Sequence, residues 1–350
     1  MKIAFIGQIK NKQTGLGKAI NDTLVYLKEN TEKLEEIDIT DNKKFISSIR
    51  KILKSEAELY YFTPSGSIFG NIRDTVYLFV MISRKRKIIT HFHNSAFGKV
   101  VESNILIKLI NKYIYSKVNK IIVLGEKSKK MFKLLDVEDS KFEIVRNGID
   151  EYLFIEPKKL SEKFLSNRRN IVFFSNMIEA KGYNIVLNLA KKMENNHDFN
   201  FYFSGKFFDE KLEKKFKNEI SSLTNVEYIS GVYSMEKKYL LEKMHYFILP
   251  SYYKDETLPI SMLEAMANGL YIIVSDVGVI SEVVNKETSR LLTKIDDETE
   301  KVIENIILES SNCLDKLDFK IDSLAKYYSN RQIQIEIFKI IKKVIKENKN

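Results

Sequence analysis

Short apolar runs alternate with amphipathic helical stretches along most of the 350-residue chain, and this alternation limits the possible folds more than any other feature. The runs are rich in Ile, Val, Phe and Tyr, which is typical of strands buried on both faces of a parallel sheet. Strands that alternate with helices predict an α/β architecture of doubly wound sheets. The expected strands are Ile3–Ile6, Leu59–Phe62, Ile88–Phe92, Ile121–Leu124, Phe142–Val145, Ile171–Phe174, Phe199–Phe203, Val226–Ile229, Tyr246–Leu249 and Tyr271–Val274.

The alternation pauses once, over residues 147–170, where the chain is polar, contains Asn-Gly and Pro157, and lacks a strand pattern. We therefore expect two Rossmann-like domains, an N-terminal one at residues 1–150 and a C-terminal one at residues 151–330. A last amphipathic helix at residues 331–348 should pack back on the first domain. Ligands of doubly wound sheets bind outside the carboxyl ends of the strands, so two facing domains would form a cleft lined by strand-to-helix loops.

The formal net charge of +10 lies entirely in the first half of the chain. Residues 1–150 contain 27 Lys+Arg against 17 Asp+Glu, a net of +10, and residues 151–350 contain 30 of each. This bias favours an anionic partner, either lipid or nucleic acid, although solvated lysine-rich faces would give the same count. The absence of an RNA-binding signature and of zinc-ligand spacing argues against nucleic acid. The single cysteine fits a reducing compartment, and we expect a cytoplasmic protein.

Two glutamates eight positions apart, Glu256 and Glu264, flank Pro259 in the segment KDETLPISMLEAMANG. Glu256 lies in the loop after an expected strand, and Pro259 suits the first turn of the helix that carries Glu264. Glu264 is about 40° around that helix from Ile260, on the expected buried face. A buried carboxylate needs donors, which ligand hydroxyls could supply, and the helix start suits a phosphate. The pattern indicates a sugar-nucleotide pocket; the alternative is a rim acid and a structural acid satisfied by backbone.

The E-x7-E pattern after a strand that ends in LPS resembles the retaining glycosyltransferases of family 4, which have the two-domain GT-B fold. The resemblance implies that Glu256 binds the 3- and 4-hydroxyls of the donor sugar and that Glu264 binds the ribose of the nucleotide. The donor-binding set that it implies also includes Thr257, Leu258 and Ile260.

Further positions of the donor site follow from the same resemblance. Lys181, in the segment FFSNMIEAKG, matches a lysine on the diphosphate, whereas Asn176 stands where the family usually has arginine. Gly205, in FSGK, matches a loop near the nucleotide. In the first domain, Gly15 and Gly17 stand where the family has a Gly-rich loop, and they would let backbone approach a phosphate closely.

Two histidines, His91 and His93, end an expected strand and share one of its faces. No cluster of Cys, Asp or Glu with metal-ligand spacing accompanies them, so we expect no metal and no cofactor. The resemblance implies that His93 contacts the donor sugar and acts in catalysis with Glu256 and Lys181. For His91 we expect a structural role.

The resemblance implies a retaining hexosyltransferase. Its donor would be a hexose or N-acetylhexosamine on a nucleotide, expected to be UDP, and its acceptor a lipid-linked saccharide in the synthesis of a bacterial-type surface polysaccharide or glycoconjugate. The basic N-terminal half, including the apolar and lysine-bearing segment 104–117, should contact the inner face of an anionic membrane. An ordinary buried helix with solvated lysines would show the same pattern.

Three alternatives remain open at this point. A sugar-nucleotide epimerase of the same fold would need acids and bases near C2 of the sugar, and none is evident. A non-catalytic membrane-binding or partner-binding module with a degenerate site fits the departure at Asn176. A Rossmann oxidoreductase is disfavoured, because the glycine fingerprint and a ribose-binding acid about 20 residues later are both missing.

Overall fold

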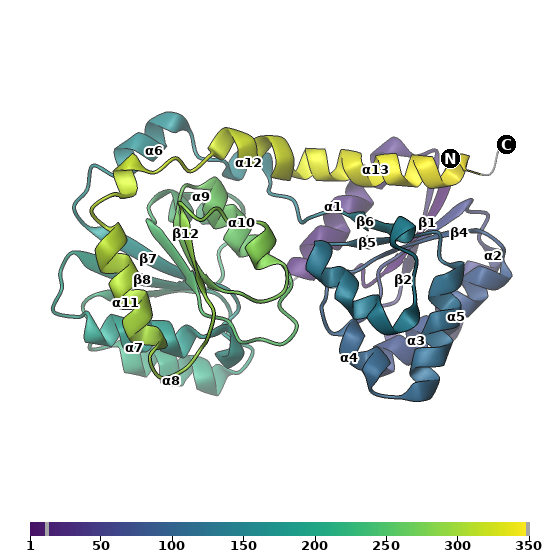
Figure 1. Cartoon of the computed structure of the whole chain (residues 1–350), viewed down its shortest axis with the longest axis horizontal. Helices are drawn as coiled ribbons and strands as arrows, with labels where there is room; N and C mark the ends of the chain where they lie inside the picture. The colour runs from purple at the N-terminus through teal and green to yellow at the C-terminus, as the bar shows by residue number, and fades with distance from the viewer. Residues whose placement is uncertain (11–13, 348–350) are drawn as a thin grey trace. The chain divides into compact units, whose positions relative to one another are not determined.

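The computed structural model describes residues 1–10 and 14–347 and divides the chain into two compact units. Unit 1 contains Met1–Gly148 together with Asn330–Asn350, and unit 2 contains Ile149–Ser329 (Figure 1). The units separate after Gly148, whereas the sequence pattern predicts a boundary after residue 150. The chain returns to unit 1 for its last helix, so unit 1 is discontinuous in sequence and unit 2 is continuous.

Unit 1 is built on a six-stranded parallel sheet with the strand order β2-β1-β3-β4-β5-β6. Its strands are β1 (Lys2–Gly7), β2 (Lys33–Asp38), β3 (Leu59–Phe62), β4 (Lys87–His91), β5 (Lys120–Val123) and β6 (Phe142–Ile144). Its α-helices are α1 (Gly15–Asn30), α2 (Phe45–Lys54), α3 (Ile68–Ser83), α4 (Phe97–Glu102), α5 (Ile105–Lys117) and α13 (Asn330–Lys346).

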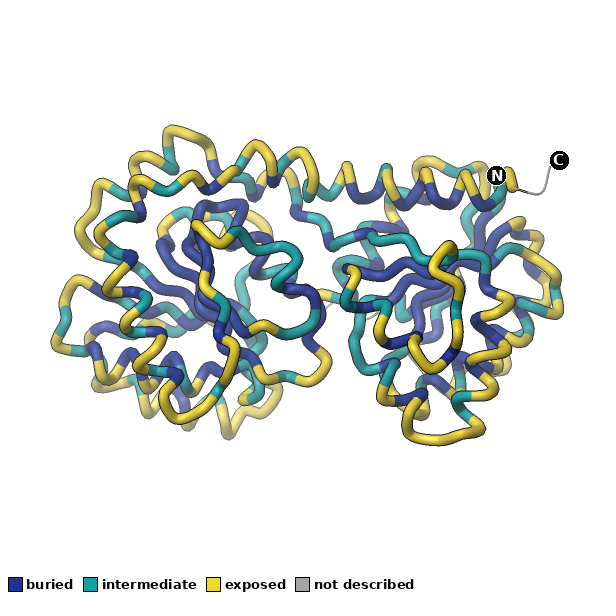
Figure 2. Tube along the Cα trace, in the orientation of Figure 1, coloured by how far each residue is buried: buried dark blue, intermediate teal, exposed yellow. Residues whose placement is uncertain are grey.

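Alternate residues of β1 show how helices cover both faces of this sheet. Ala4 and Ile6 pack in a core cluster with side chains from α2, α3, α4 and α5. Ile3 and Phe5 point the other way, into a second cluster with α1 and with Ile337 and other apolar side chains of α13. Since successive side chains of a strand point to opposite faces, β1 is buried on both sides. Figure 2 shows this buried layer running through the strands.

Unit 2 contains a second six-stranded parallel sheet, with the order β12-β11-β10-β7-β8-β9. Its strands are β7 (Arg169–Phe174), β8 (Phe199–Ser204), β9 (Val226–Ile229), β10 (Tyr246–Leu249), β11 (Tyr271–Ser275) and β12 (Ser289–Leu292). Its α-helices are α6 (Pro157–Lys163), α7 (Tyr183–Lys192), α8 (Glu210–Ile220), α9 (Ser234–Glu242), α10 (Ile260–Ala267), α11 (Thr299–Ser310) and α12 (Ile321–Tyr328). The predicted α/β architecture of doubly wound parallel sheets is confirmed.

The strand order of unit 2 reverses between β7 and β10. From β7 the chain continues outward through β8 and β9, whereas β10, β11 and β12 extend in the other direction. The carboxyl ends of β7 and β10 are therefore the topological switch point of the sheet. In open α/β sheets, ligands bind at this position.

Candidate functional site

Two loops meet at the switch point of unit 2, one after β7 and one after β10. The backbone N–H of Tyr252 donates to the carbonyl of Ala180 at 2.8 Å, which joins the loops directly. Gly182 follows in the left-handed region with φ of 83°, and a Cβ there would lie 2.4 Å from the carbonyl oxygen of Pro250. Only glycine permits this close approach of the two backbones.

The predicted residues Lys181 and Glu256 are brought together by these loops. Their side chains form an ion pair, with Glu256 only 7% exposed and the side chain of Lys181 13% exposed. The hydroxyl of Ser251 donates to the same carboxylate at 3.3 Å. The Lys181 ammonium also lies 5.0 Å from the ring centroid of Tyr253, within the range of a cation–π contact. The carboxylate and the ammonium are thus held in place from several sides.

The second predicted glutamate, Glu264, lies on α10 and is 2% exposed. Lys237 of α9 donates to its carboxylate at 2.8 Å, so one of the donors that it needs comes from the chain itself. Spacing along α10 could not reveal this partner, which is distant in sequence. A signal did exist on α9, where Lys237 stands three and four positions before the buried Leu240 and Leu241, on the face turned inward.

Helix α10 begins between the two glutamates. Pro259 is its N-cap residue rather than part of its first turn, and in the described chain no side chain caps this helix start. The burial differs from the expected stripe, because Met262 to Ala267 are all buried while Ile260 is only half-buried. The N–H groups of the first turn lie beside the half-buried Ile260 and Ser261, a typical arrangement for binding an anion.

The residues just before α10 are held by the loop that follows β11. Thr257 and Leu258 are each 4% exposed, and the carbonyl of Thr257 accepts from the N–H of Val279 at 3.0 Å. Gly278, with φ of 57°, packs so closely that a Cβ would lie 2.3 Å from the same carbonyl oxygen. The sequence analysis did not identify Gly278, since a lone glycine after a strand is common.

Gly205 and Asn176 lie at the carboxyl ends of β8 and β7. A Cβ on Gly205 would be 1.8 Å from the carbonyl oxygen of Ser175, so the β8 loop can approach the β7 loop only with glycine here. The loops are also joined by a hydrogen bond from the N–H of Met177 to the carbonyl of Lys206 at 2.9 Å. Asn176, between these contacts, is half-buried. Gly205 therefore sets the distance between neighbouring loops.

In unit 1, the predicted glycines lie at the start of α1. Thr14 caps this helix, and its hydroxyl accepts from the N–H of Gly17 at 3.1 Å. The N–H of Gly17 is therefore engaged by this cap, whereas Gly15 is exposed, and their close approach to a phosphate stays a prediction. Part of the predicted loop, residues 11–13, lies outside the described residues.

His91 and His93 stack at the end of β4 with 3.9 Å between their ring centroids. The Tyr61 hydroxyl and Nδ1 of His91 are 2.5 Å apart, consistent with a structural role. Burial lowers the pKa of His93 to about 4, so its ring is neutral at pH 7. Among the described residues, Nδ1 of His93, Oγ1 of Thr63 and Oδ1 of Asn94 are buried without hydrogen-bond partners. Such atoms suit a polar, uncharged ligand, and Thr63 and Asn94 escaped the sequence analysis.

His245, which precedes β10, is structural. Its Nδ1 accepts from the N–H of Asn170 at 2.9 Å, and its Nε2 lies 3.0 Å from the carbonyl of Lys163. Burial lowers the pKa of His245 to about 4, which keeps the ring neutral. Burial also lowers the pKa of Lys163 to about 7, and its ammonium donates to the carbonyls of Leu241 and Asn268 at 3.2 and 2.6 Å. These contacts join α6 to β10 and to the ends of α9 and α10.

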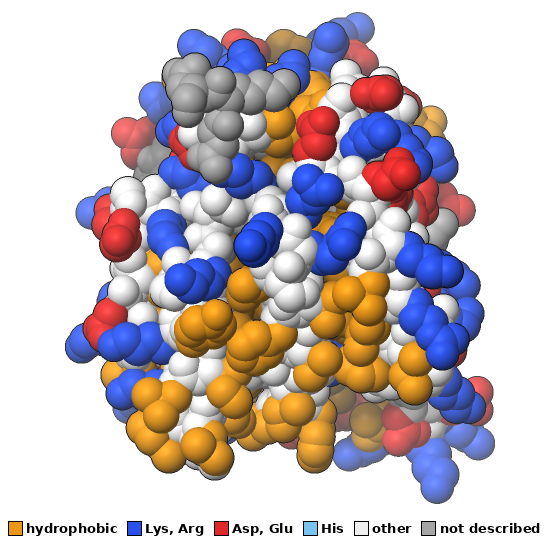
Figure 3. Space-filling view, turned by 90° about the vertical axis from the view of Figure 1, so that its right-hand side faces the viewer, with side chains coloured by type: hydrophobic (Ala, Val, Ile, Leu, Met, Phe, Trp, Pro, Cys, Tyr) orange, Lys and Arg blue, Asp and Glu red, His pale blue; other side chains and the backbone are white. Residues whose placement is uncertain are grey.

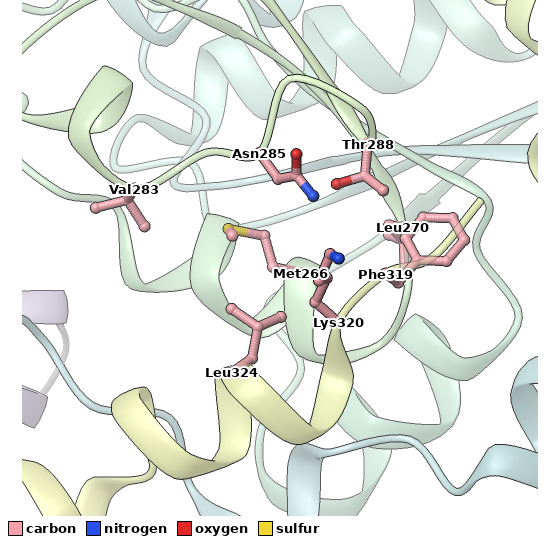
Figure 4. Close-up of a pocket in the computed structure, with 8 residues that line it drawn as sticks. All are labelled: Met266, Leu270, Val283, Asn285, Thr288, Phe319, Lys320 and Leu324. Carbon is pink, nitrogen blue, oxygen red and sulfur yellow. The ribbon is translucent and has the colours of Figure 1, made fainter.

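A cavity of about 190 Å³ lies elsewhere in unit 2, at the amino ends of β11 and β12 (Figure 4). It is on the opposite edge of the sheet from the switch point, so it is not part of the candidate site. Its lining is mostly apolar and consists of Met266, Leu270, Val283, Asn285, Thr288, Phe319, Lys320 and Leu324.

Residues 1–10 and 14–347 contain neither a candidate metal site nor a candidate membrane span. No group of three or more His, Cys, Asp or Glu side chains could hold a metal ion in this part of the chain. No helix there is both long enough and apolar enough to cross a membrane.

The chain is similar to known proteins in sequence and in fold. Residues 155–316 match the family model described as Glycosyl transferases group 1. An uncharacterized glycosyltransferase of Methanocaldococcus jannaschii is 26% identical over 273 residues, covering 75% of this chain and 67% of that protein. The crystal structure of Anabaena HepE in complex with UDP-glucose aligns with a TM-score of 0.72 at 14% identity, over 98% of this chain and 100% of that chain.

A third relative by fold is the sucrose-phosphate synthase of Thermosynechococcus elongatus. It aligns with a TM-score of 0.72 at 13% identity, over 98% of this chain and 99% of that one. The predicted GT-B fold is thereby confirmed, and the match to the Glycosyl transferases group 1 model lies within unit 2. Membership of family 4 and the roles of the two glutamates stay predictions.

Proposed function

We propose that the chain is a retaining glycosyltransferase that moves a hexose or N-acetylhexosamine from a UDP-sugar to a saccharide acceptor. One observation carries the proposal. Two buried acid–lysine pairs, Lys181 with Glu256 and Lys237 with Glu264, flank the uncapped start of α10 at the switch point of unit 2. A nucleotide sugar has the complementary groups in the same order, namely sugar hydroxyls, a diphosphate and ribose hydroxyls.

Each side chain has a role that its chemistry supports. Glu256 accepts hydrogen bonds from sugar hydroxyls, and Glu264, which is paired with Lys237, accepts from the ribose. Lys181 and the N–H groups of α10 stabilise the charge that grows on the diphosphate as the bond to the sugar breaks, which is where electrostatic stabilisation is most effective. Lys181 would exchange the Glu256 carboxylate for the diphosphate when the donor binds. This exchange would give the diphosphate a positive charge, and so offset the loss of the arginine that the family usually has at the position of Asn176.

The chemical step that we propose keeps the anomeric configuration. An acceptor hydroxyl oxygen bonds to C1 of the sugar on the face from which the diphosphate leaves, and its proton passes to the departing phosphate oxygen. The chain's own residues orient the donor and stabilise charge in this scheme.

The nucleotide and the acceptor are the finer parts of the proposal. A bound UDP-glucose in Anabaena HepE, which shares the fold, supports UDP as the nucleotide. The net charge of +10 in residues 1–150 supports an acceptor displayed on an anionic membrane, such as a lipid-linked saccharide of a surface polysaccharide or glycoconjugate. We propose a cytoplasmic enzyme that works at the inner membrane face.

A thermal-shift screen against UDP-, GDP-, TDP- and ADP-sugars tests the donor. A ligand at about 100 times its Kd adds roughly 2.7 kcal/mol to the apparent free energy of unfolding. We expect the UDP-sugars to raise the melting temperature most and the Glu256→Ala variant to respond less. Silence with all four nucleotides would contradict the proposal, and conversion of a UDP-sugar to its epimer without an acceptor would identify an epimerase instead.

A further inference from the structure

Two neighbouring helices of unit 1 expose an unusual number of large apolar side chains. The exposed fraction ranges from 38% for Val76 to 86% for Phe69. We call this surface the α3–α5 face. It consists of Ile68, Phe69, Ile72, Val76 and Phe79 of α3 and Ile105, Leu106, Leu109, Ile110 and Tyr113 of α5. The predicted alternative of an ordinary buried helix does not hold for α5, of which only Asn111, Ile114 and Tyr115 are buried.

The apolar surface is continuous because the two helices are joined side by side. On their inner faces, Asn71 and Asn111 exchange a reciprocal pair of amide hydrogen bonds at 3.1 and 3.0 Å. On the outer side, the rings of Phe79 and Tyr113 stack with 5.8 Å between centroids. Contiguous exposed apolar patches of this kind mark interaction sites on soluble domains.

Charge on the same helices has one sign. Helix α5 contains Lys108, Lys112 and Lys117 and no acid, although Lys112 is paired with the exposed Asp136 beyond the helix. The one acid of α3, Asp74, is buried and paired with Arg73 at 2.9 Å. Arg84, Lys85 and Arg86 follow the end of α3. Figure 3 shows a band of hydrophobic side chains across the lower part of this side of unit 1, with Lys and Arg side chains above it.

We propose that the α3–α5 face docks on an anionic lipid bilayer, with its apolar side chains among the acyl chains and its lysines at the headgroups. Helices with one apolar face and a basic flank lie in the plane of the membrane interface in this way. A second copy of the chain is a poorer occupant, since a symmetric contact would bring the same lysines and arginines together. This inference deepens the proposed function. It rests on that function in one respect only, because a lipid-linked acceptor would be the enzyme's reason to bind a membrane.

Vesicle flotation with the full chain, without donor or acceptor, tests the docking. The vesicles contain phosphatidylcholine with or without about 30% phosphatidylglycerol. We expect binding to the anionic vesicles that weakens as salt is added. The Phe69→Asp/Leu106→Asp variant should partition more than about tenfold less. The control is Leu165→Asp/Phe208→Asp in unit 2, which changes side chains that are 82% and 68% exposed, and it should bind like the wild type.

Three results would overturn the docking. They are no binding of the wild type to either vesicle, equal loss in both double variants, and a dimer in sedimentation analysis that disappears only in the Phe69→Asp/Leu106→Asp variant. The UDP-sugar thermal shift is recorded on the same samples. A shift without vesicle binding contradicts the docking alone, and vesicle binding without a shift contradicts the proposed donor alone.

Discussion

Units 1 and 2 share a plan of six parallel strands but differ at the carboxyl edges of their sheets. In unit 2 that edge contains charged groups, with Glu256 and Glu264 each paired to a lysine. In unit 1 it contains the neutral His93 and buried polar atoms that have no partners among the described residues. Similar backbones therefore support an edge suited to a charged ligand in one unit and an uncharged one in the other.

The contrast between the two edges predicts that removing the charge of Glu256 in unit 2 has the largest effect, which is a loss of transfer activity. For Glu256→Gln we expect a loss of transfer of about 10²- to 10³-fold, the size seen when one stabilising group of an active site is lost. A coupled assay of UDP release with acceptor present measures the effect. Asp255→Asn, one position earlier and exposed, is the control and should retain its activity. Full turnover by Glu256→Gln would remove the role assigned to this residue.

The pair at Glu264 tests whether the charges of unit 2 depend on one another. Lys237→Met leaves a carboxylate that is 2% exposed without its lysine, and we expect a loss of about 3–5 kcal/mol in the free energy of unfolding. Urea unfolding followed by circular dichroism measures the loss.

The matched control for Lys237→Met is Lys214→Met, on the exposed side of α8. Adding Glu264→Gln to Lys237→Met should recover part of the stability, because the uncompensated charge is then gone. If Lys237→Met is as stable as Lys214→Met, the pair does not stabilise unit 2.

Acid should destabilise both units through their neutral histidines. Burial lowers the pKa of His245 to about 4, while an unfolded histidine titrates near 6.5. Between these values the unfolded state binds a proton that the folded state does not, so stability falls as pH drops from about 6.5 to 4. We expect His245→Gln to lose roughly 3 kcal/mol less than the wild type over this range.

Urea unfolding at a series of pH values measures that difference. In the His93→Gln variant the free energy of unfolding should also fall less steeply as pH drops, because burial lowers the pKa of His93 to about 4 as well. Parallel curves for the wild type and His245→Gln would show that His245 is protonated in the folded protein.

The smallest effect that we predict concerns the join between α3 and α5. Asn111→Ala leaves the buried amide of Asn71 without its reciprocal partner and should cost about 1–3 kcal/mol. Replacing both residues with leucine should recover most of the loss, since neither polar group then remains. Thermal unfolding compares the three proteins. A double variant no more stable than Asn111→Ala would mean that shape, rather than hydrogen bonding, matters at this contact.

Strands with apolar runs could be predicted from the sequence, and strands without such runs could not. The central strands and the edge strands β6 and β9 were predicted, but the edge strands β2 and β12 were missed. β2 reads KLEEID with one fully buried residue. Such a strand lacks the apolar run that is typical of a strand buried on both faces.

Some residues of the candidate site could also be anticipated from the sequence, and others could not. Glu256 was anticipated from its place in a loop after an apolar strand, and Lys181 from the family resemblance; β7 and β10, which precede their loops, are neighbours in the sheet. The spacing of Lys237 before Leu240 and Leu241 indicates that it faces inward, but its contact with Glu264 depends on how α9 packs against α10. The α3 part of the exposed apolar face was also missed, since an apolar helix gives no sign of which side is left uncovered.

The return of the last helix to unit 1 has a consequence for biosynthesis. Ile3 and Phe5 of the first strand pack against Ile337 and Ile341, which leave the ribosome only after the whole of unit 2. Unit 2, which is continuous in sequence, can complete its core first. Until α13 emerges, one side of the unit 1 sheet lacks part of its cover, and a nascent chain stalled before residue 330 would present that surface to chaperones.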